Sequence, residues 1–189
     1  KVKNAEGKSE IHVLNLKTFE YTPSAKAKFA TVDAAKQIDD VKSRIKALHH
    51  GTDKAGDFYR NVTALVNKYV SFRIPEIADE LYKIDDAVKA GFGWELGPFE
   101  TWDVLGVEKT AQMMEASGFA PASWVKEMTA AGNKSFYITE NGKRKFYDVA
   151  TKSYKDIPGA DAFILLDNYR TQKPLFQNAG ATLSDIGDG

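Results

Sequence analysis

One stretch of ten residues constrains the fold of this chain more than any other. From Gly91 to Glu100 the sequence reads GFGWELGPFE, which contains three glycines, two phenylalanines, a tryptophan and a proline. Gly91 can adopt the left-handed conformation that ends one helix, and Pro98 suits the first turn of the next. The stretch therefore predicts a compact aromatic turn that joins two helices.

Apolar residues recur with helical spacing on both sides of this turn. Before it we expect helices that start at Thr31 or Asp33, near Asp57 and near Pro75, and that end at residues 50, 72 and 90. In the second helix, an apolar stripe lies at i, i+4, i+7 and i+11 and is predicted to be buried. Its members are Phe58, Val62, Leu65 and Tyr69.

After the turn, shorter helices are expected over residues 98–105, 107–117 and 121–131, each ended by a glycine. Residues 1–23 and 136–154 alternate between apolar and polar side chains, which predicts two β-hairpins. We therefore expect a mainly α fold, a compact helical bundle flanked by two β-hairpins.

The two predicted hairpins are related in sequence. At an offset of 135 residues, Gly7, Lys8, Lys17 and Pro23 match identical residues, and Ile11 and Phe19 align with aromatic residues. This pattern indicates the tail of one repeat followed by a complete second repeat, with a chance match as the alternative. We expect three parts: residues 1–26 end a preceding repeat, 27–158 form a helical domain with its terminal hairpin, and 159–189 are a linker and the first strand of a following domain. Because the chain starts at Lys1 without methionine, we expect a piece of a longer polypeptide.

Composition excludes several classes of protein. Lys plus Arg and Asp plus Glu number 26 each, so no excess positive charge favours nucleic acid or an anionic membrane. No cysteine occurs, which excludes disulfides and cysteine metal sites and fits a reducing, cytoplasmic compartment. No apolar run reaches the ~18 residues of a transmembrane helix. The expected partners are proteins or small molecules.

The histidines give no indication of a catalytic or metal site. His49 and His50 lie at a predicted helix C-terminus, where a partly charged imidazole interacts favourably with the helix dipole, and metal or acid/base work is the alternative. His12 alternates with apolar neighbours and is expected to face solvent from a strand. No glycine-rich nucleotide-binding loop follows a predicted strand, so this piece should not bind a nucleotide cofactor alone.

Acidic and aromatic residues around the turn have two interpretations. Glu95, Glu100 and Asp103 could serve a functional site, but Glu100 lies at about the third position of a helix, where its carboxylate satisfies backbone donors. The aromatic residues are expected in the core rather than in a ligand platform; they are Phe92, Trp94, Phe99 and Trp102. We assign no catalytic, cofactor-binding or metal-binding residue.

Residues 85–106 read DDAVKAGFGWELGPFETWDVLG. This stretch resembles the C-terminal helical domain of L-3-hydroxyacyl-CoA dehydrogenases, for which the pattern DxAxxxGFGxxxGPFExxDxxG is a specific mark. The order of segments is similar to the long bacterial fatty-acid β-oxidation proteins, in which a nicotinamide-binding domain and two such helical domains precede an enoyl-CoA hydratase domain. Residues 181–189 resemble the first strand of that hydratase domain.

The resemblance implies a non-catalytic role for this piece. In the family, the catalytic His and Glu and the NAD-binding loop belong to the nucleotide-binding domain, and no residue here can stand for them. A family asparagine follows a glycine by four residues, whereas Asn61 follows Gly56 by five, with Arg60 at the expected place. One extra residue rotates a helical position by ~100°, so Asn61 inherits no catalytic role.

The resemblance also implies partners. This second copy would pack against the preceding helical domain and help to close the acyl-CoA cleft, with NAD held by the nucleotide-binding domain of the longer protein. A non-enzymatic helical protein-interaction module is the alternative, and a third, minor interpretation is an acyl-CoA binding domain that holds its ligand alone.

Overall fold

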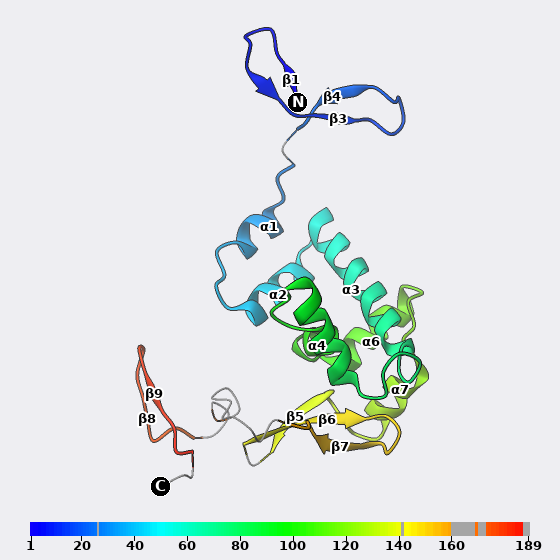
Figure 1. The fold of residues 1–189 in the computed structure, drawn as a ribbon, viewed down its shortest axis with the longest axis vertical. Helices are drawn as coiled ribbons and strands as arrows, with labels where there is room; N and C mark the ends of the chain where they lie inside the picture. The colour runs from blue at the N-terminus through cyan, green and yellow to red at the C-terminus, as the bar shows by residue number, and fades with distance from the viewer. Residues whose placement is uncertain (26, 141, 160–168, 170–172, 187–189) are drawn as a thin grey trace.

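The computed structural model describes residues 1–25, 27–140, 142–159, 169 and 173–186. Within these residues the chain forms seven helices and nine strands. The helices make a central body, with small antiparallel sheets at the N-terminal and C-terminal sides (Figure 1). The expectation of a mainly α bundle is wrong, because the fold is mixed α/β and one of its sheets completes the hydrophobic core.

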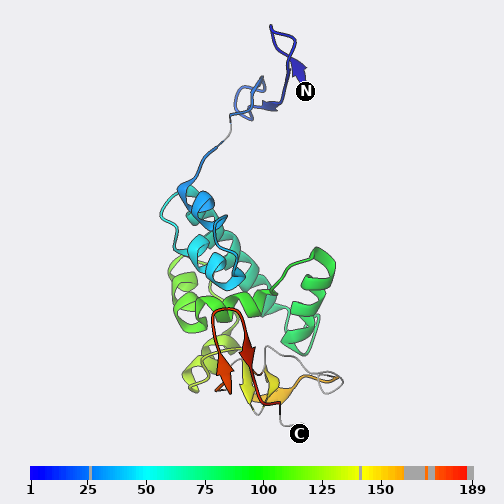
Figure 2. The same cartoon turned by 90° about the vertical axis from the view of Figure 1, so that its left-hand side faces the viewer.

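Short connections join the helices of the central body, which Figure 2 shows from a second direction. The helices are α1 Ala30–Ala35, α2 Val41–His50, α3 Lys54–Phe72, α4 Leu81–Phe92, α5 Pro98–Leu105, α6 Val107–Ala116 and α7 Ser123–Ala130. The boundaries at Pro98 and Gly106 agree with the sequence prediction, since proline is the first residue of α5 and Gly106 follows its end with a φ of 88°.

Two helix predictions were wrong in their boundaries. The first predicted helix is divided into α1 and α2, because the Asp40 carboxylate accepts a hydrogen bond from the Ser43 N–H at 2.7 Å and starts a new helix. The third predicted helix begins at Leu81 rather than near Pro75. Residues 73–77 instead form turns, with the Ile77 N–H bonded to the Arg73 carbonyl at 2.8 Å.

The second predicted hairpin is a three-stranded antiparallel sheet. Its strands are β5 Tyr137–Glu140, β6 Lys143–Asp148 and β7 Ser153–Asp156, in that order across the sheet. Phe146 and Tyr147 on β6 are buried, and Phe136 immediately before β5 is fully buried. The sheet is therefore part of the folded domain and does not merely flank it.

Residues 1–23 form two small hairpins that lie apart from the helices (Figure 1). The hairpins pair β1 Val2–Lys3 with β2 Ser9–Glu10, and β3 His12–Leu14 with β4 Tyr21–Pro23. Near the C-terminus, β8 Phe176–Gln177 pairs with β9 Thr182–Leu183. Residues 160–168 and 170–172 of the predicted linker lie outside the described residues.

The core gathers around Phe136. Its ring lies 5.0 Å from the ring of Phe99, 5.2 Å from Trp102 and 5.8 Å from Trp124, measured between centroids. Phe99 and Trp102 are fully buried, which confirms their expected place in the core. The elements that meet here are α5, α7 and the start of β5.

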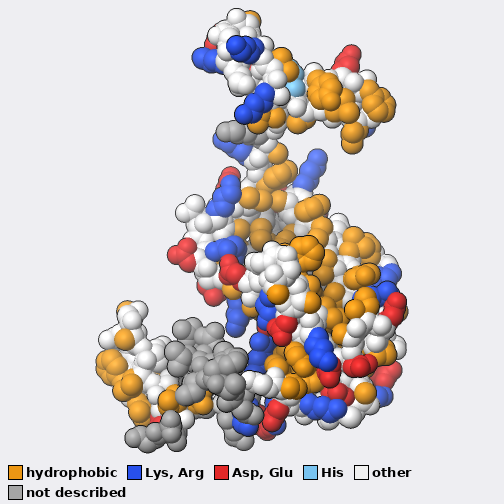
Figure 3. Space-filling view, in the orientation of Figure 1, with side chains coloured by type: hydrophobic (Ala, Val, Ile, Leu, Met, Phe, Trp, Pro, Cys, Tyr) orange, Lys and Arg blue, Asp and Glu red, His pale blue; other side chains and the backbone are white. Residues whose placement is uncertain are grey.

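The apolar stripe of α3 is exposed, contrary to prediction. Phe58 is 69% exposed, Leu65 51% and Tyr69 59%, while the helix buries Thr63, Ala64, Asn67 and Val70 on its other side. Apolar side chains accordingly gather on the surface over α3 and its neighbours (Figure 3). No element among the described residues covers this stripe.

Candidate functional site

The turn from 91 to 100 is built differently from the prediction. Gly91 remains inside α4, and Gly93, with a φ of 67°, adopts the left-handed conformation that ends the helix. The next constraint is at Gly97, where a Cβ would collide with the side chain and backbone of Asp85. Glycine at 97 lets the start of α5 approach α4 closely.

Asp85 fixes this close approach. Its carboxyl group is fully buried and accepts hydrogen bonds from the N–H groups of Phe99 at 2.9 Å and Glu100 at 3.0 Å and from the Tyr137 hydroxyl at 2.8 Å. Burial raises the pKa of Asp85 to about 7, although these three donors act in the opposite direction. Asp85 on α4 thus caps α5 and ties both helices to β5.

Glu100 has the structural role that its position predicted. Its carboxylate accepts a hydrogen bond from the Gly97 N–H at 2.7 Å and forms ion pairs with Arg144 at 2.8 Å and Lys89 at 3.2 Å. Burial acts to raise the pKa of Glu100, but the Gly97 N–H and Arg144 outweigh it and hold the pKa below its usual value. Arg144 also lies over the Tyr137 ring at 4.0 Å.

Asp103 joins α5 to the sheet. Its two carboxyl oxygens accept hydrogen bonds from the N–H groups of Phe136 at 2.7 Å and Tyr137 at 2.9 Å. Burial raises the pKa of Asp103 to about 7 against these two bonds. Since backbone donors occupy Asp85 and Asp103, the buried carboxyl groups connect elements of the fold and present no free base to a substrate. Glu95, the third candidate, is exposed on the turn.

The histidines do not form a metal site. His49 is buried, and neither ring nitrogen has a hydrogen-bond partner. Burial, reinforced by the charges of His50, Arg60 and Lys109, lowers the pKa of His49 to about 4, so the expectation of a partly charged imidazole is wrong for this residue. His12 lies in β3, 3.6 Å from the Glu10 carboxylate. No cluster of metal-ligating side chains occurs among the residues that the structure describes.

Arg60 and Asn61 have different environments on α3. The Arg60 guanidinium donates hydrogen bonds to the carbonyl oxygens of His49 at 2.7 Å and Gly51 at 2.5 Å, so it fastens the end of α2 to the start of α3. Asn61 is exposed. Arg60, which stands at the place expected for the family asparagine, therefore connects two helices.

The described residues do not fit a nicotinamide cofactor. Every strand pair in the described part is antiparallel, and the glycines at 91 and 93 lie at the C-terminal end of α4. A dinucleotide site of the usual kind needs a strand followed by a helix N-terminus that faces the pyrophosphate. We therefore assign no step of any reaction to a nucleotide held by these residues. In the described ranges no helix is long and apolar enough to cross a membrane.

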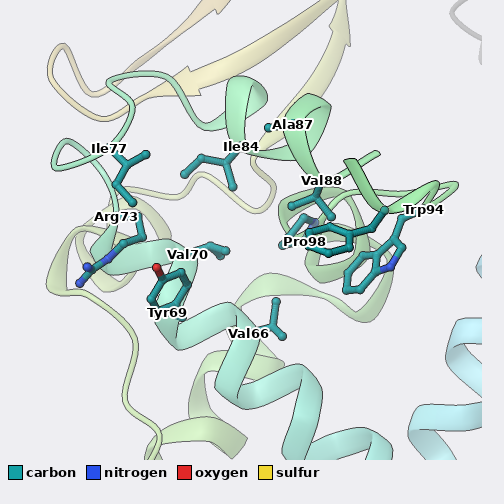
Figure 4. Close-up of a pocket in the computed structure, with 11 residues that line it drawn as sticks. Val66, Tyr69, Val70, Arg73, Ile77, Ile84, Ala87, Val88, Trp94 and Pro98 are labelled. Atoms are coloured by element: carbon teal, nitrogen blue, oxygen red, sulfur yellow. The ribbon is translucent and has the colours of Figure 1, made fainter. Parts of the chain in front are cut away.

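Two apolar hollows adjoin beside the exposed stripe. The first, of about 390 Å³, lies between α3 and α4, with Arg73 at one end and Trp94 at the other (Figure 4). The second, of about 380 Å³, lies between α2, α3 and the turn. Both are lined by Val66, Trp94 and Pro98, so we call the pair the α3 trough. Trp94 is 47% exposed and Phe92 77% exposed, contrary to their expected burial in the core.

Sequence reasoning missed Asp85 and Tyr137 as central residues. One signal was present for Asp85, which follows Leu81 by four residues and precedes Val88 by three, on the face predicted to be apolar. A carboxyl group on such a face must find buried donors. Tyr137 gave no comparable signal, because its partner lies 52 positions away in the sequence.

Comparisons with known proteins agree with the resemblance of residues 85–106. The family described as 3-hydroxyacyl-CoA dehydrogenase, C-terminal domain, matches residues 58–148. The chain is 39% identical over 184 residues to a probable 3-hydroxyacyl-CoA dehydrogenase of Bacillus subtilis (strain 168). The match covers 97% of this chain and 23% of that relative, so the chain corresponds to about a quarter of the relative's length.

Proposed function

Because this chain belongs, through residues 58–148, to the C-terminal domain family of 3-hydroxyacyl-CoA dehydrogenases, we propose that it is the helical scaffold of such an enzyme. The reaction of the longer protein is the NAD-dependent oxidation of 3-hydroxyacyl-CoA to 3-oxoacyl-CoA in fatty-acid β-oxidation. Catalytic residues and NAD belong to another domain of that polypeptide. We place the protein in the cytoplasm, which its lack of cysteine supports.

One observation carries the scaffold role. The end of the turn, from Gly97 to Glu100, is held by buried hydrogen bonds, whereas the adjacent stripe of α3 presents large apolar side chains to solvent. Exposed apolar surface of this kind usually marks an interface. The proposed partner for the stripe is the preceding helical domain, and the cleft beside it would take acyl-CoA.

The proposed domain arrangement follows from the repeat. Residues 1–23 align with residues 136–158, which contain the three-stranded sheet, and both segments form antiparallel hairpins. Ile11 is 62% exposed and Phe19 75% exposed, whereas their counterpart positions are Phe146, which is buried, and Tyr154, which packs against the core. We infer that residues 1–26 close a preceding copy, residues 27–158 form the second copy, and residues 159–189 lead into a following domain.

The first test is enzymatic. This chain alone should not oxidise NADH with acetoacetyl-CoA, whereas the longer natural protein should. Turnover by this chain, or its absence in the longer protein, would contradict the proposal.

The second test concerns the interface. In the longer protein, Leu65→Asp together with Tyr69→Asp should lower kcat/KM at least tenfold, because two buried charges would separate the helical domains. A matched variant with Asp at two solvent-exposed lysines, Lys109 and Lys126, should retain activity. If both variants behave alike, the stripe has no scaffold role and a protein-interaction module becomes the better description.

A further inference from the structure

We propose that the α3 trough binds an unbranched aliphatic chain, and that Trp94 sets the length of chain that it accepts. This inference deepens the proposed function and rests on it for the source of the ligand, the acyl group of a thioester. The trough adjoins the turn directly, since Trp94 and Pro98 line both of its hollows.

The lining of the first hollow identifies the ligand class. Apart from the Tyr69 hydroxyl and Arg73, its walls are hydrocarbon and aromatic side chains from α3, α4 and the turn. Its volume lies within the range of roughly 300–1000 Å³ that is usual for small-molecule sites. Such a lining offers burial of apolar surface and few hydrogen bonds, which suits a saturated chain rather than a polar metabolite.

The wall of each hollow includes one residue with a side-chain nitrogen that lacks a hydrogen-bond partner, although the Arg73 guanidinium also forms an ion pair with Glu76 through Nη1. The Arg73 Nε is buried without an acceptor, and its guanidinium lies 4.9 Å from the centre of the Tyr69 ring. Asn67, on the wall of the second hollow, is 1% exposed, and its side-chain nitrogen has no acceptor. A buried donor without an acceptor is costly, so a ligand oxygen at either place would be stabilising. An aliphatic chain that ends in a carboxylate or a thioester carbonyl has both required parts.

Trp94 occupies the junction between the hollows. It lines both of them, and its position on the turn follows directly from the left-handed Gly93. Because its ring is about half exposed, truncation would join the hollows without opening a cavity in the core. Trp94 therefore acts as a partition, and a short chain should occupy one hollow while a longer chain must displace the ring.

Calorimetric titration of this chain with dodecanoate tests the binding site. We expect saturable binding at one site. Ala87→Phe fills the first hollow from an exposed position on α4 and should weaken binding at least tenfold. Phe19→Ala, which removes an exposed aromatic ring from the distant N-terminal hairpins, should leave the affinity unchanged. Absence of binding, or equal binding by the Ala87→Phe variant, would overturn the proposal.

Chain length tests the role of Trp94. In the Trp94→Ala variant, the affinity for hexadecanoate relative to octanoate should rise at least fivefold. An unchanged ratio of affinities would show that Trp94 does not separate the two hollows. In the longer protein, kcat/KM for long-chain substrates should rise by a similar factor. If this chain binds fatty acid but the longer protein has no dehydrogenase activity, the proposed function is rejected and the trough remains supported as a binding site. Dehydrogenase activity of the longer protein without fatty-acid binding by this chain would support the proposed function and reject the trough as a binding site.

Discussion

Two apolar clusters of this chain differ in burial. The cluster of Phe99, Trp102 and Phe136 is fully buried between α5, α7 and the sheet. The stripe of Phe58, Leu65 and Tyr69 on α3 is comparably apolar, yet more than half of each side chain is exposed. Hydrophobic spacing therefore identifies surfaces that will be covered, but it does not say whether the same chain supplies the cover.

The largest difference between the clusters should appear on truncation of Trp102. Trp102→Ala should lower the free energy of unfolding by about 3–5 kcal/mol, because it opens a cavity among rings about 5 Å apart and removes the indole donor to the Val107 carbonyl. Urea denaturation monitored by circular dichroism measures this change. A loss below about 1 kcal/mol would mean that the buried cluster is not the true core.

Removal of the Asp85 carboxyl group should cause the second-largest loss of stability. Asp85→Ala leaves the N–H groups of Phe99 and Glu100 and the Tyr137 hydroxyl without their acceptor, and should cost about 3 kcal/mol. The neighbouring Asp86 is the control, because it is exposed and forms only a surface ion pair with Lys89. Asp86→Ala should change stability by less than about 0.5 kcal/mol. Equal effects would show that the buried network does not hold α4 and α5 together.

The buried side of the molecule should also respond to pH through His49. Its pKa is about 4 in the folded state and 6.5 in the reference state, so the unfolded chain binds a proton first as pH falls. The contribution of His49 to the free energy of unfolding is therefore constant above about pH 6.5 and falls between pH 6.5 and 4, by up to about 3 kcal/mol.

Two carboxyl groups oppose this trend. Asp85 and Asp103 have pKa values raised to about 7, so folding gains stability from them as pH falls. The difference between wild type and His49→Leu isolates the histidine, and His50→Leu is the exposed control. If wild type and His49→Leu have parallel stability curves from pH 7 to 4, His49 is not buried as a neutral ring.

Substitution in the exposed stripe of α3 should have the smallest effect on the stability of this chain. Leu65→Ser should change the free energy of unfolding of this chain by less than about 0.5 kcal/mol, because the side chain already contacts water. Thermal unfolding of the purified chain measures it. A loss above about 2 kcal/mol would mean that the stripe is covered even in this chain, which would remove the distinction between the two clusters.

Local sequence signals predicted much of the backbone. Pro98 and Gly106 placed the ends of α5, and the glutamate at position 100 predicted the bond to the Gly97 N–H. The helices from α5 to α7 agree with prediction. These features depend on residues within about four positions of one another, which the sequence displays directly.

Features that depend on distant residues were harder to predict. The sheet of β5, β6 and β7 belongs to the core because Phe136 and Phe146 meet helices from elsewhere in the chain, which hairpin patterning alone cannot indicate. The role of Tyr137 likewise comes from Asp85, which lies far away in sequence.

The sequence by itself determined the family, through residues 85–106, and the ends of the helices around the turn. Tertiary structure alone decided which face of α3 is buried, and it placed Thr63, Ala64 and Asn67 inside rather than the more apolar stripe. The physical reason is that periodicity records only that a face avoids water. Which surface covers that face depends on the positions of all the other elements.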